Sequence, residues 1–244
     1  MRSNGMGVST AEVDVLNSVE APDASSAGEL RAEVISPQRT SAWNADSYAR
    51  AQIRGLVRQV FLAGAPRSVR QVVFSPIEAD TGVRTICRRV GEALARETAS
   101  SIAVLSANSR LLVNSDQCTE PSSRENLRPL QRIATRVRDN LWLVPRSGLD
   151  FGLGSASSLL SFLAELRREF EYSIVEAPPA GERIEAATMA QFADGIILVL
   201  AAHRTRRVTA RKVKEMLEAS HVRVLGTILS ERTFPVPEGL YRRL

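Results

Sequence analysis

The sequence predicts a doubly wound α/β fold, in which a mostly parallel sheet carries helices on both faces. Short apolar runs alternate with amphipathic segments of about ten residues, the pattern of βαβ units. The run at 194–200, Asp-Gly-Ile-Ile-Leu-Val-Leu, is apolar almost throughout, as in a strand covered on both faces. A strand-like run at 71–75 leads through a tight loop into a helical pattern, which is the layout of a phosphate-binding loop.

The chain of 244 residues suits one such domain and a tail. Residues 1–45 are expected to form a disordered N-terminal tail, because Met1 to Gly28 is rich in Ser, Ala, Gly and acidic residues and shows no sustained apolar period. The domain is expected over 46–244. It opens with a predicted helix, since apolar residues recur at helical spacing at Tyr48, Ile53, Leu56, Val57, Val60 and Phe61.

The remaining elements follow in alternation. Strands are expected at 72–74, 101–105, 140–144, 172–175, 194–200 and 222–229. Helices are expected at 85–96, 124–139, 157–168, 185–192 and 207–219, and the polar stretch 107–124 is expected to be a loop. The first of these helices places Ile86, Val90 and Leu94 on one face. The third has an apolar face made by Leu159, Leu160, Leu163 and Leu166.

The charge and residue composition of the chain limit the kinds of partner that we expect it to bind. The net charge is +5, mostly through Arg pairs such as Arg88-Arg89 and Arg167-Arg168, which favours acidic partners such as anionic lipid or nucleic acid. The pairs are scattered and lack interleaved aromatic residues, so solvated helix faces are the favoured interpretation and nucleic acid is not expected. The two cysteines, Cys87 and Cys118, lack a metal-binding spacing. Neither a membrane-spanning run nor a secretory leader is recognised, so a cytoplasmic protein is expected.

The predicted phosphate loop departs from the pattern that its chemistry needs. Such a loop uses glycines so that backbone N–H groups close around phosphate, a Lys for the β/γ-phosphates and a Ser/Thr for magnesium. The candidate residues are Thr81, Gly82, Val83, Arg84 and Thr85, and Val83 stands where the Lys belongs. Two interpretations are open. Arg84, Thr85 and the helix N-terminus bind phosphate, or the segment is an ordinary connection in which Asp80 or Thr81 caps the helix.

From about Ala51 to Leu244 the chain resembles the cytoplasmic domain of bacterial tyrosine kinases of capsule and exopolysaccharide synthesis. These are ParA/MinD-type P-loop ATPases with a deviant Walker A motif. The resemblance rests on Gln-Ile-Arg-Gly-Leu at 52–56, Glu-Tyr-Ser-Ile-Val-Glu-Ala-Pro-Pro at 171–179, Ala-Asp-Gly-Ile-Ile-Leu-Val-Leu at 193–200, His-Arg-Thr-Arg at 203–206 and Val-Leu-Gly-Thr-Ile-Leu-Ser at 224–230. Leu-Trp-Leu-Val-Pro-Arg-Ser-Gly at 141–148 fits the family's loop after a strand.

The departures from this family fall on its chemical residues. Its loop reads Pro-Gly-Glu-Gly-Lys-Ser-Thr, where this chain has Ala-Asp-Thr-Gly-Val-Arg-Thr at 79–85. Its Asp-x-Asp motif is replaced by Ser106-Ala107-Asn108, and Glu176 is a Walker B-like remnant where the family has Asp. The resemblance therefore implies no catalytic residue beyond the Glu176 remnant and no metal ligand. No cofactor is expected, and ATP with Mg²⁺ binds only if the degenerate loop is competent.

Tyrosines give a second comparison with the family, whose active members end in a cluster of tyrosines that they phosphorylate. This chain has three tyrosines, and Tyr241 is the candidate phospho-acceptor near its end. Tyr172 opens a predicted strand and is expected to be packed.

The first hypothesis is a catalytically degenerate homologue that regulates or scaffolds polysaccharide biosynthesis and export. An active tyrosine autokinase or ATPase with an unusual loop is the alternative, and a ParA/MinD-like positioning protein is the third. The partners that the resemblance implies are the membrane polysaccharide co-polymerase (Wzz-type) and kinase homologues. A homo-oligomer, contact with an anionic membrane, and a place at the inner face of the membrane are further expectations.

Overall fold

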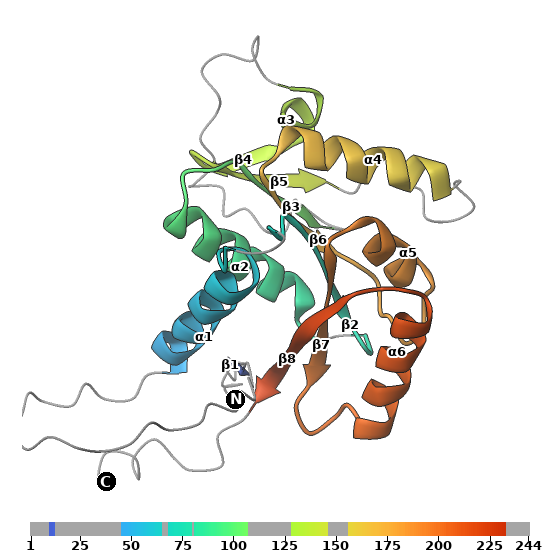
Figure 1. Cartoon of the computed structure of the whole chain (residues 1–244). Coiled ribbons are helices and arrows are strands. Elements are labelled where there is room, and N and C mark those ends of the chain that lie inside the picture. The colour runs from blue at the N-terminus through green and yellow to red at the C-terminus, as the bar shows by residue number, and fades with distance from the viewer. Residues whose placement is uncertain are drawn as a thin grey trace, which may run out of the picture.

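The strands and helices of the chain alternate along the sequence, as their apolar patterns predict (Figure 1). The computed structural model describes residues 10–12, 45–64, 68–79, 81–106, 128–145 and 156–232. The strands are β1 (Thr10–Glu12), β2 (Gln71–Pro76), β3 (Ile102–Ser106), β4 (Thr135–Arg138), β5 (Leu141–Pro145), β6 (Tyr172–Glu176), β7 (Gly195–Ala201) and β8 (Val224–Arg232). The helices are α1 (Ala45–Val60), α2 (Val83–Glu97), α3 (Pro129–Ile133), α4 (Ala156–Glu169), α5 (Glu185–Phe192) and α6 (Arg207–Ala219).

The eight strands form one sheet in the order β1-β8-β7-β2-β6-β3-β5-β4. All pairs from β8 to β5 are parallel, and the two edge strands β1 and β4 are antiparallel to their neighbours. The predicted doubly wound, mostly parallel α/β fold is therefore confirmed. β2 lies between β6 and β7, so the loop at its carboxyl end opens at the point where the strand order reverses, the usual place for a ligand in such sheets.

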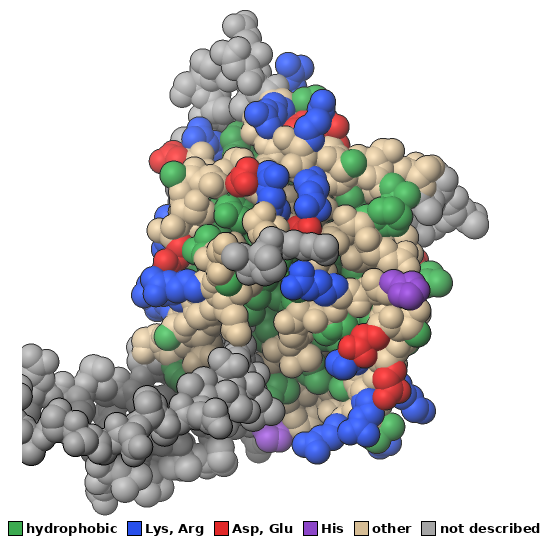
Figure 2. Space-filling model, in the orientation of Figure 1, with side chains coloured by type: hydrophobic (Ala, Val, Ile, Leu, Met, Phe, Trp, Pro, Cys, Tyr) green, Lys and Arg blue, Asp and Glu red, His purple; other side chains and the backbone are tan. Residues whose placement is uncertain are grey.

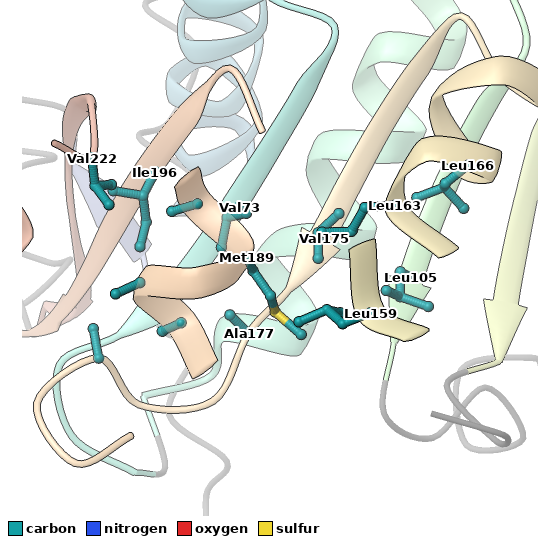
Figure 3. Close-up of a cluster of buried hydrophobic side chains, with 14 of the residues drawn as sticks. Val73, Leu105, Leu159, Leu163, Leu166, Val175, Ala177, Met189, Ile196 and Val222 are labelled. Atoms are coloured by element: carbon teal, nitrogen blue, oxygen red, sulfur yellow. The ribbon is translucent and has the colours of Figure 1, made fainter. Parts of the chain in front are cut away.

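Alternation along each strand sends neighbouring side chains to opposite faces and builds two cores. Val72 and Phe74 face α1 and α2, where they pack with Leu56, Val90 and Leu94. Val73 faces the other side, which α3 to α6 cover. Figure 3 shows that second core, in which Met189 of α5 and Leu159, Leu163 and Leu166 of α4 lie against Val73, Leu105 and Val175 of the sheet.

The predicted helix over 124–139 is wrong. Its described part, from residue 128, forms the five-residue helix α3 and then strand β4, which pairs antiparallel with β5. The turn at Asp139-Asn140 is polar and suits a hairpin, and Val137 packs against the α1–α2 core. Arg136 lies over the Trp142 ring, 5.5 Å from its centroid. These contacts across the hairpin outweigh a local helical preference.

The N-terminal segment contributes one short strand and the first residue of α1 to the described structure. Within residues 1–45, Thr10–Glu12 forms β1 beside β8, and α1 begins at Ala45. The other residues of the predicted disordered tail lie outside the described residues, as does the predicted loop at 107–124, so both remain predictions.

Asp194 ties the starts of β2 and β7 together. Its carboxylate accepts hydrogen bonds from the backbone N–H groups of Arg70 (2.7 Å) and Gln71 (2.8 Å) and from the Arg167 guanidinium (2.8 Å). Burial raises the pKa of Asp194, but the two N–H groups and Arg167 together lower it below its ordinary value. The ionised carboxylate therefore stabilises the folded state.

We expect Asp194→Asn to lower the free energy of unfolding at pH 7 by about 1–3 kcal/mol. The amide nitrogen would replace one accepting oxygen and would face either the Arg167 guanidinium or the two backbone N–H groups. The folded pKa is lower than the unfolded one, so the carboxylate's contribution is present above the unfolded pKa and is lost as the pH falls through the folded pKa. Urea unfolding should show the gap between wild type and variant shrinking below about pH 3.9. Asp139→Asn, at a fully exposed side chain, is the control and should change stability little. A gap that stays constant with pH would contradict this role.

Candidate functional site

The first part of the loop after β2 is bound into the sheet. The Ile77 N–H donates to the Val199 carbonyl (3.1 Å), which continues the β2–β7 ladder by one residue. The carbonyls of Pro76 and Ile77 accept hydrogen bonds from the N–H groups of Ala180 (2.8 Å) and Gly181 (3.3 Å). The Ile77 side chain is buried. These groups are engaged within the protein.

Gly181 permits this close approach of two loops. A Cβ atom at Gly181 would lie 2.7 Å from the Ile77 carbonyl oxygen, inside van der Waals contact. The Ser75 hydroxyl adds a hydrogen bond of 2.6 Å to the Pro178 carbonyl. The Pro-Pro segment after β6 is thereby fastened against the loop after β2.

The helix after the loop begins at Val83, two residues earlier than predicted. Gly82 is its N-cap in the left-handed region, with φ of 70°, which explains why a glycine is retained at this position. The first intrahelical bond runs from the Ile86 N–H to the Gly82 carbonyl (3.2 Å). Val83, Arg84 and Thr85 therefore form the first turn of α2, where N–H groups lack intrahelical acceptors.

The cap that the sequence suggested at Thr81 is not made. Gly82 occupies the N-cap, and no side-chain hydrogen bond caps the helix. The Thr81 hydroxyl is buried, and in the described part of the chain it has no hydrogen-bond partner. The other suggested cap, Asp80, lies outside the described residues.

Arg84 and Glu176 meet at the carboxyl end of the sheet. The Arg84 Nε atom lies 3.6 Å from the Glu176 Oε1 atom, close enough for an ion pair. Glu176 ends β6, and its side chain is only 9% exposed, whereas the Arg84 side chain is 36% exposed, so water reaches the pair from the Arg84 side. A fixed cation thus lies against the carboxylate that stands at the magnesium-supporting position of the resembled family.

Cys87 lies one turn further along α2 and closes the apolar side of the site. It is fully buried. Burial raises the pKa of the Cys87 thiol, and the negative charge of Glu176 raises it further. The thiol is therefore held neutral, as expected of a packed small residue rather than a nucleophile.

Glu78 is held at the turn that follows β7. The Thr205 hydroxyl donates to the Glu78 carboxylate (3.4 Å), and Arg204 donates to the Ala79 carbonyl (3.0 Å). This turn is the His-Arg-Thr-Arg segment, in which His203 adopts a φ of 65° where the resembled family often has glycine. The contacts fasten the middle of the loop to a segment more than one hundred residues away in sequence.

The site does not fit a magnesium–ATP complex of the kind that the P-loop fold implies. Val83 supplies no cation for the β/γ-phosphates, and Arg84 is a guanidinium where a magnesium hydroxyl is needed. Glu176 already has Arg84 as a cationic neighbour. Among the described residues no group of three or more His, Cys, Asp or Glu side chains could hold a metal ion.

The structure brings together only some of the predicted site residues. Thr81, Gly82, Val83, Arg84 and Thr85 lie in one turn beside Glu176. The side chains of Ser106, Ala107 and Asn108, and the candidate acceptor Tyr241, lie outside the described residues. The sequence analysis did not predict that Thr205 and Arg204 hold the loop after β2. The resemblance of the segment 203–206 to a family turn was the one indication that this segment matters.

Comparisons with known proteins define the class of this fold. No protein-family model matches the chain. The kinase domain of the Escherichia coli tyrosine kinase ETK matches with a TM-score of 0.60 and 14% identity, over 78% of this chain and 79% of that domain. The MinD cell division protein of Aquifex aeolicus matches with a TM-score of 0.52 and 16% identity, over 71% and 72%. The fold is that of the ParA/MinD-like P-loop ATPases and the bacterial tyrosine kinase domains.

A curated relative narrows the resemblance. The tyrosine-protein kinase CpsD of Streptococcus agalactiae serotype III (strain NEM316) is 39% identical over 66 residues. This stretch is 27% of the present chain and 28% of the length of CpsD. The resemblance to the capsule and exopolysaccharide tyrosine kinases that the sequence motifs indicated is thereby confirmed.

None of the described helices has the length and apolar character needed to cross a membrane.

Proposed function

We propose that this chain is a catalytically degenerate homologue of the capsule and exopolysaccharide tyrosine kinases, and that it regulates or scaffolds polysaccharide biosynthesis. One observation carries the proposal: the Arg84 guanidinium lies 3.6 Å from Glu176. In this position an internal cation takes the place of the metal that a working site would bind.

The positive charge of Arg84 opposes the binding of magnesium at Glu176. Magnesium at this site would have to approach Glu176 against the positive charge of Arg84, or displace that side chain and leave a guanidinium without its partner. The loop adds a second obstacle, because the Ile77 N–H already donates to the Val199 carbonyl and is not available to a phosphate. The Arg84–Glu176 pair and the hydrogen-bonded loop both stabilise the domain in the absence of nucleotide. A binding module that never hydrolyses ATP needs this stability.

A scaffolding role requires a folded domain that can bind other proteins, and it does not require nucleotide chemistry. We propose that its partners are the membrane polysaccharide co-polymerase and active kinase homologues, with which it would assemble at the inner face of the membrane. The ParA/MinD-like positioning role is supported less, because in the view of Figure 2 the Lys and Arg side chains lie in several separate groups and do not form one continuous basic face.

The test is calorimetric titration of the full chain with ATP and ADP, with and without magnesium. We expect no magnesium-dependent heat of binding at millimolar nucleotide, and no incorporation of labelled phosphate into the chain. Tyr241→Phe is the matched control for autophosphorylation. Micromolar, magnesium-dependent ATP binding would overturn the proposal. A purified complex with the co-polymerase's cytoplasmic segment, assayed separately, tests the scaffolding part.

One observation favours the alternative of an ATP-binding autokinase. The first turn of α2 holds Arg84 and Thr85 beside backbone N–H groups without intrahelical acceptors, and the Thr81 hydroxyl there is buried without a partner in the described part of the chain. A phosphate seated there would satisfy all of these donors. The same titration decides between the two functions, because the alternative requires binding that Arg84→Ala weakens.

A further inference from the structure

A groove of about 500 Å³ is lined by residues of α1 and α2. Its floor includes Ile53 and Ala93, and arginines from both helices line it. They are Arg50, Arg54, Arg88, Arg89 and Arg96. With Glu92 and Glu97 as the acidic lining residues, the groove carries an excess of three positive charges.

The two glutamates neutralise the groove only in part. Glu97 is shared by Arg54 (3.3 Å) and by Arg58 (3.0 Å), which lies outside the lining. Glu92 lies 3.5 Å from the Arg88 Nε atom, yet that atom is buried and makes no hydrogen bond in the described part of the chain. A buried guanidinium donor without an acceptor is costly, and an anionic ligand would satisfy it.

Two further arginines reach the groove without a partner. Among the described residues, no hydrogen bond or ion pair engages the side chains of Arg50 and Arg96, which come from different helices. Together with Arg88, these two arginines supply the groove with planar guanidinium donors from both helices. Such forks match the oxygen atoms of phosphate groups bidentately.

The groove is separate from the candidate nucleotide site. Arg96 is thirteen residues further along α2 than Val83, so about 20 Å of helix lies between the first turn and the far end of the groove. The near end, at Arg88, lies one turn along α2 from Arg84, but the lining residues all come from α1 and α2 and none from the loop before Val83.

We propose that the α1–α2 groove binds a compact polyphosphate-bearing ligand. An isolated carboxylate would neutralise only one of the three excess charges, whereas adjacent phosphoryl groups supply several charges within a volume of this size. The proposal goes beyond the proposed function and does not depend on it, because the groove lies outside the nucleotide loop. The phosphoryl groups belong either to a soluble phosphorylated molecule or to a lipid headgroup.

The test is titration of the full chain with inorganic tripolyphosphate at low salt. We expect saturable binding that Arg50→Gln combined with Arg96→Gln weakens about tenfold or more, because two charge-assisted contacts are lost. The matched control is Arg207→Gln with Arg211→Gln on α6, which removes the same charge from exposed positions and should leave the affinity within about twofold. Thermal unfolding should show that both double variants remain folded.

Three outcomes would overturn the proposal. They are no binding at millimolar tripolyphosphate, equal weakening by the α6 control, and loss of binding in Arg84→Gln, which would assign the phosphate to the loop. Sedimentation with vesicles that contain phosphatidylinositol bisphosphate, whose headgroup carries several phosphates, separates the two sources. Sedimentation that the groove variant abolishes assigns a lipid headgroup, and tripolyphosphate binding without sedimentation assigns a soluble ligand.

Discussion

Replacing Val83 by Lys and Arg84 by Ser together is expected to raise the affinity for magnesium–ATP by about 100-fold over the wild-type chain. The lysine would supply the cation for the β/γ-phosphates from the first turn of α2. The serine would remove the guanidinium from Glu176 and supply a hydroxyl for magnesium. Either change alone is expected to give less, since each leaves one defect in place.

The measurement is the same calorimetric titration, made on the double variant with and without magnesium. Lys212→Ser is the control, because it removes an exposed cation from α6, outside both the loop and the α1–α2 groove, and introduces the same hydroxyl. It should leave nucleotide binding unchanged. A double variant that still fails to bind would mean that the fastening of Ile77 to Val199 and Gly181 limits the site, and not the side chains at 83 and 84.

Phe74→Ala is expected to lower the free energy of unfolding by about 3–5 kcal/mol. Phe74 is completely buried in the central strand β2, and it packs in the core beneath α1 and α2. Removing its ring leaves a cavity that the neighbouring strands β6 and β7 hold open, because both are hydrogen-bonded to β2.

Urea unfolding of the full chain measures this loss. Phe192→Ala is the control, since Phe192 on α5 is 48% exposed, and the same truncation there should cost about 0.5 kcal/mol or less. If Phe74→Ala does not fold, Phe74→Leu should still fold with a smaller loss, because it keeps most of the volume. Equal effects at positions 74 and 192 would contradict the assignment of Phe74 to the core.

The sequence predicted the central strands and long helices well, because each carries its own apolar period. The run 194–200 became β7 and the amphipathic segment 207–219 became α6, each within about a residue of its predicted ends. The segment 124–139 lacked such a signal. Its α3 is capped from a distance: the Glu169 carboxylate of α4 accepts hydrogen bonds from the Leu130 N–H at 3.0 and 3.1 Å. No local pattern at 128–133 indicates that partner.

Some properties of the candidate site can be predicted from the sequence, and others only from the structure. The sequence alone shows that the loop lacks the lysine, at Val83, and the magnesium hydroxyl, at Arg84. The sequence does not show that Arg84 reaches Glu176, because the two residues are 92 positions apart. The parallel pairing of β2 with β6 brings them together. The same holds for Glu78 and Thr205, which meet because β2 also pairs with β7.

The sequence by itself determined the α/β class, the order of the main strands and helices, and the loss of the family's lysine, because periodicity and residue identity are local properties. The tertiary structure alone decided where each remaining charge acts. It placed the Arg84 cation against Glu176 and gathered five arginines of α1 and α2 around one groove. Electrostatic energy depends on distance through space and on burial, which are set by strand order and helix packing rather than by position along the chain.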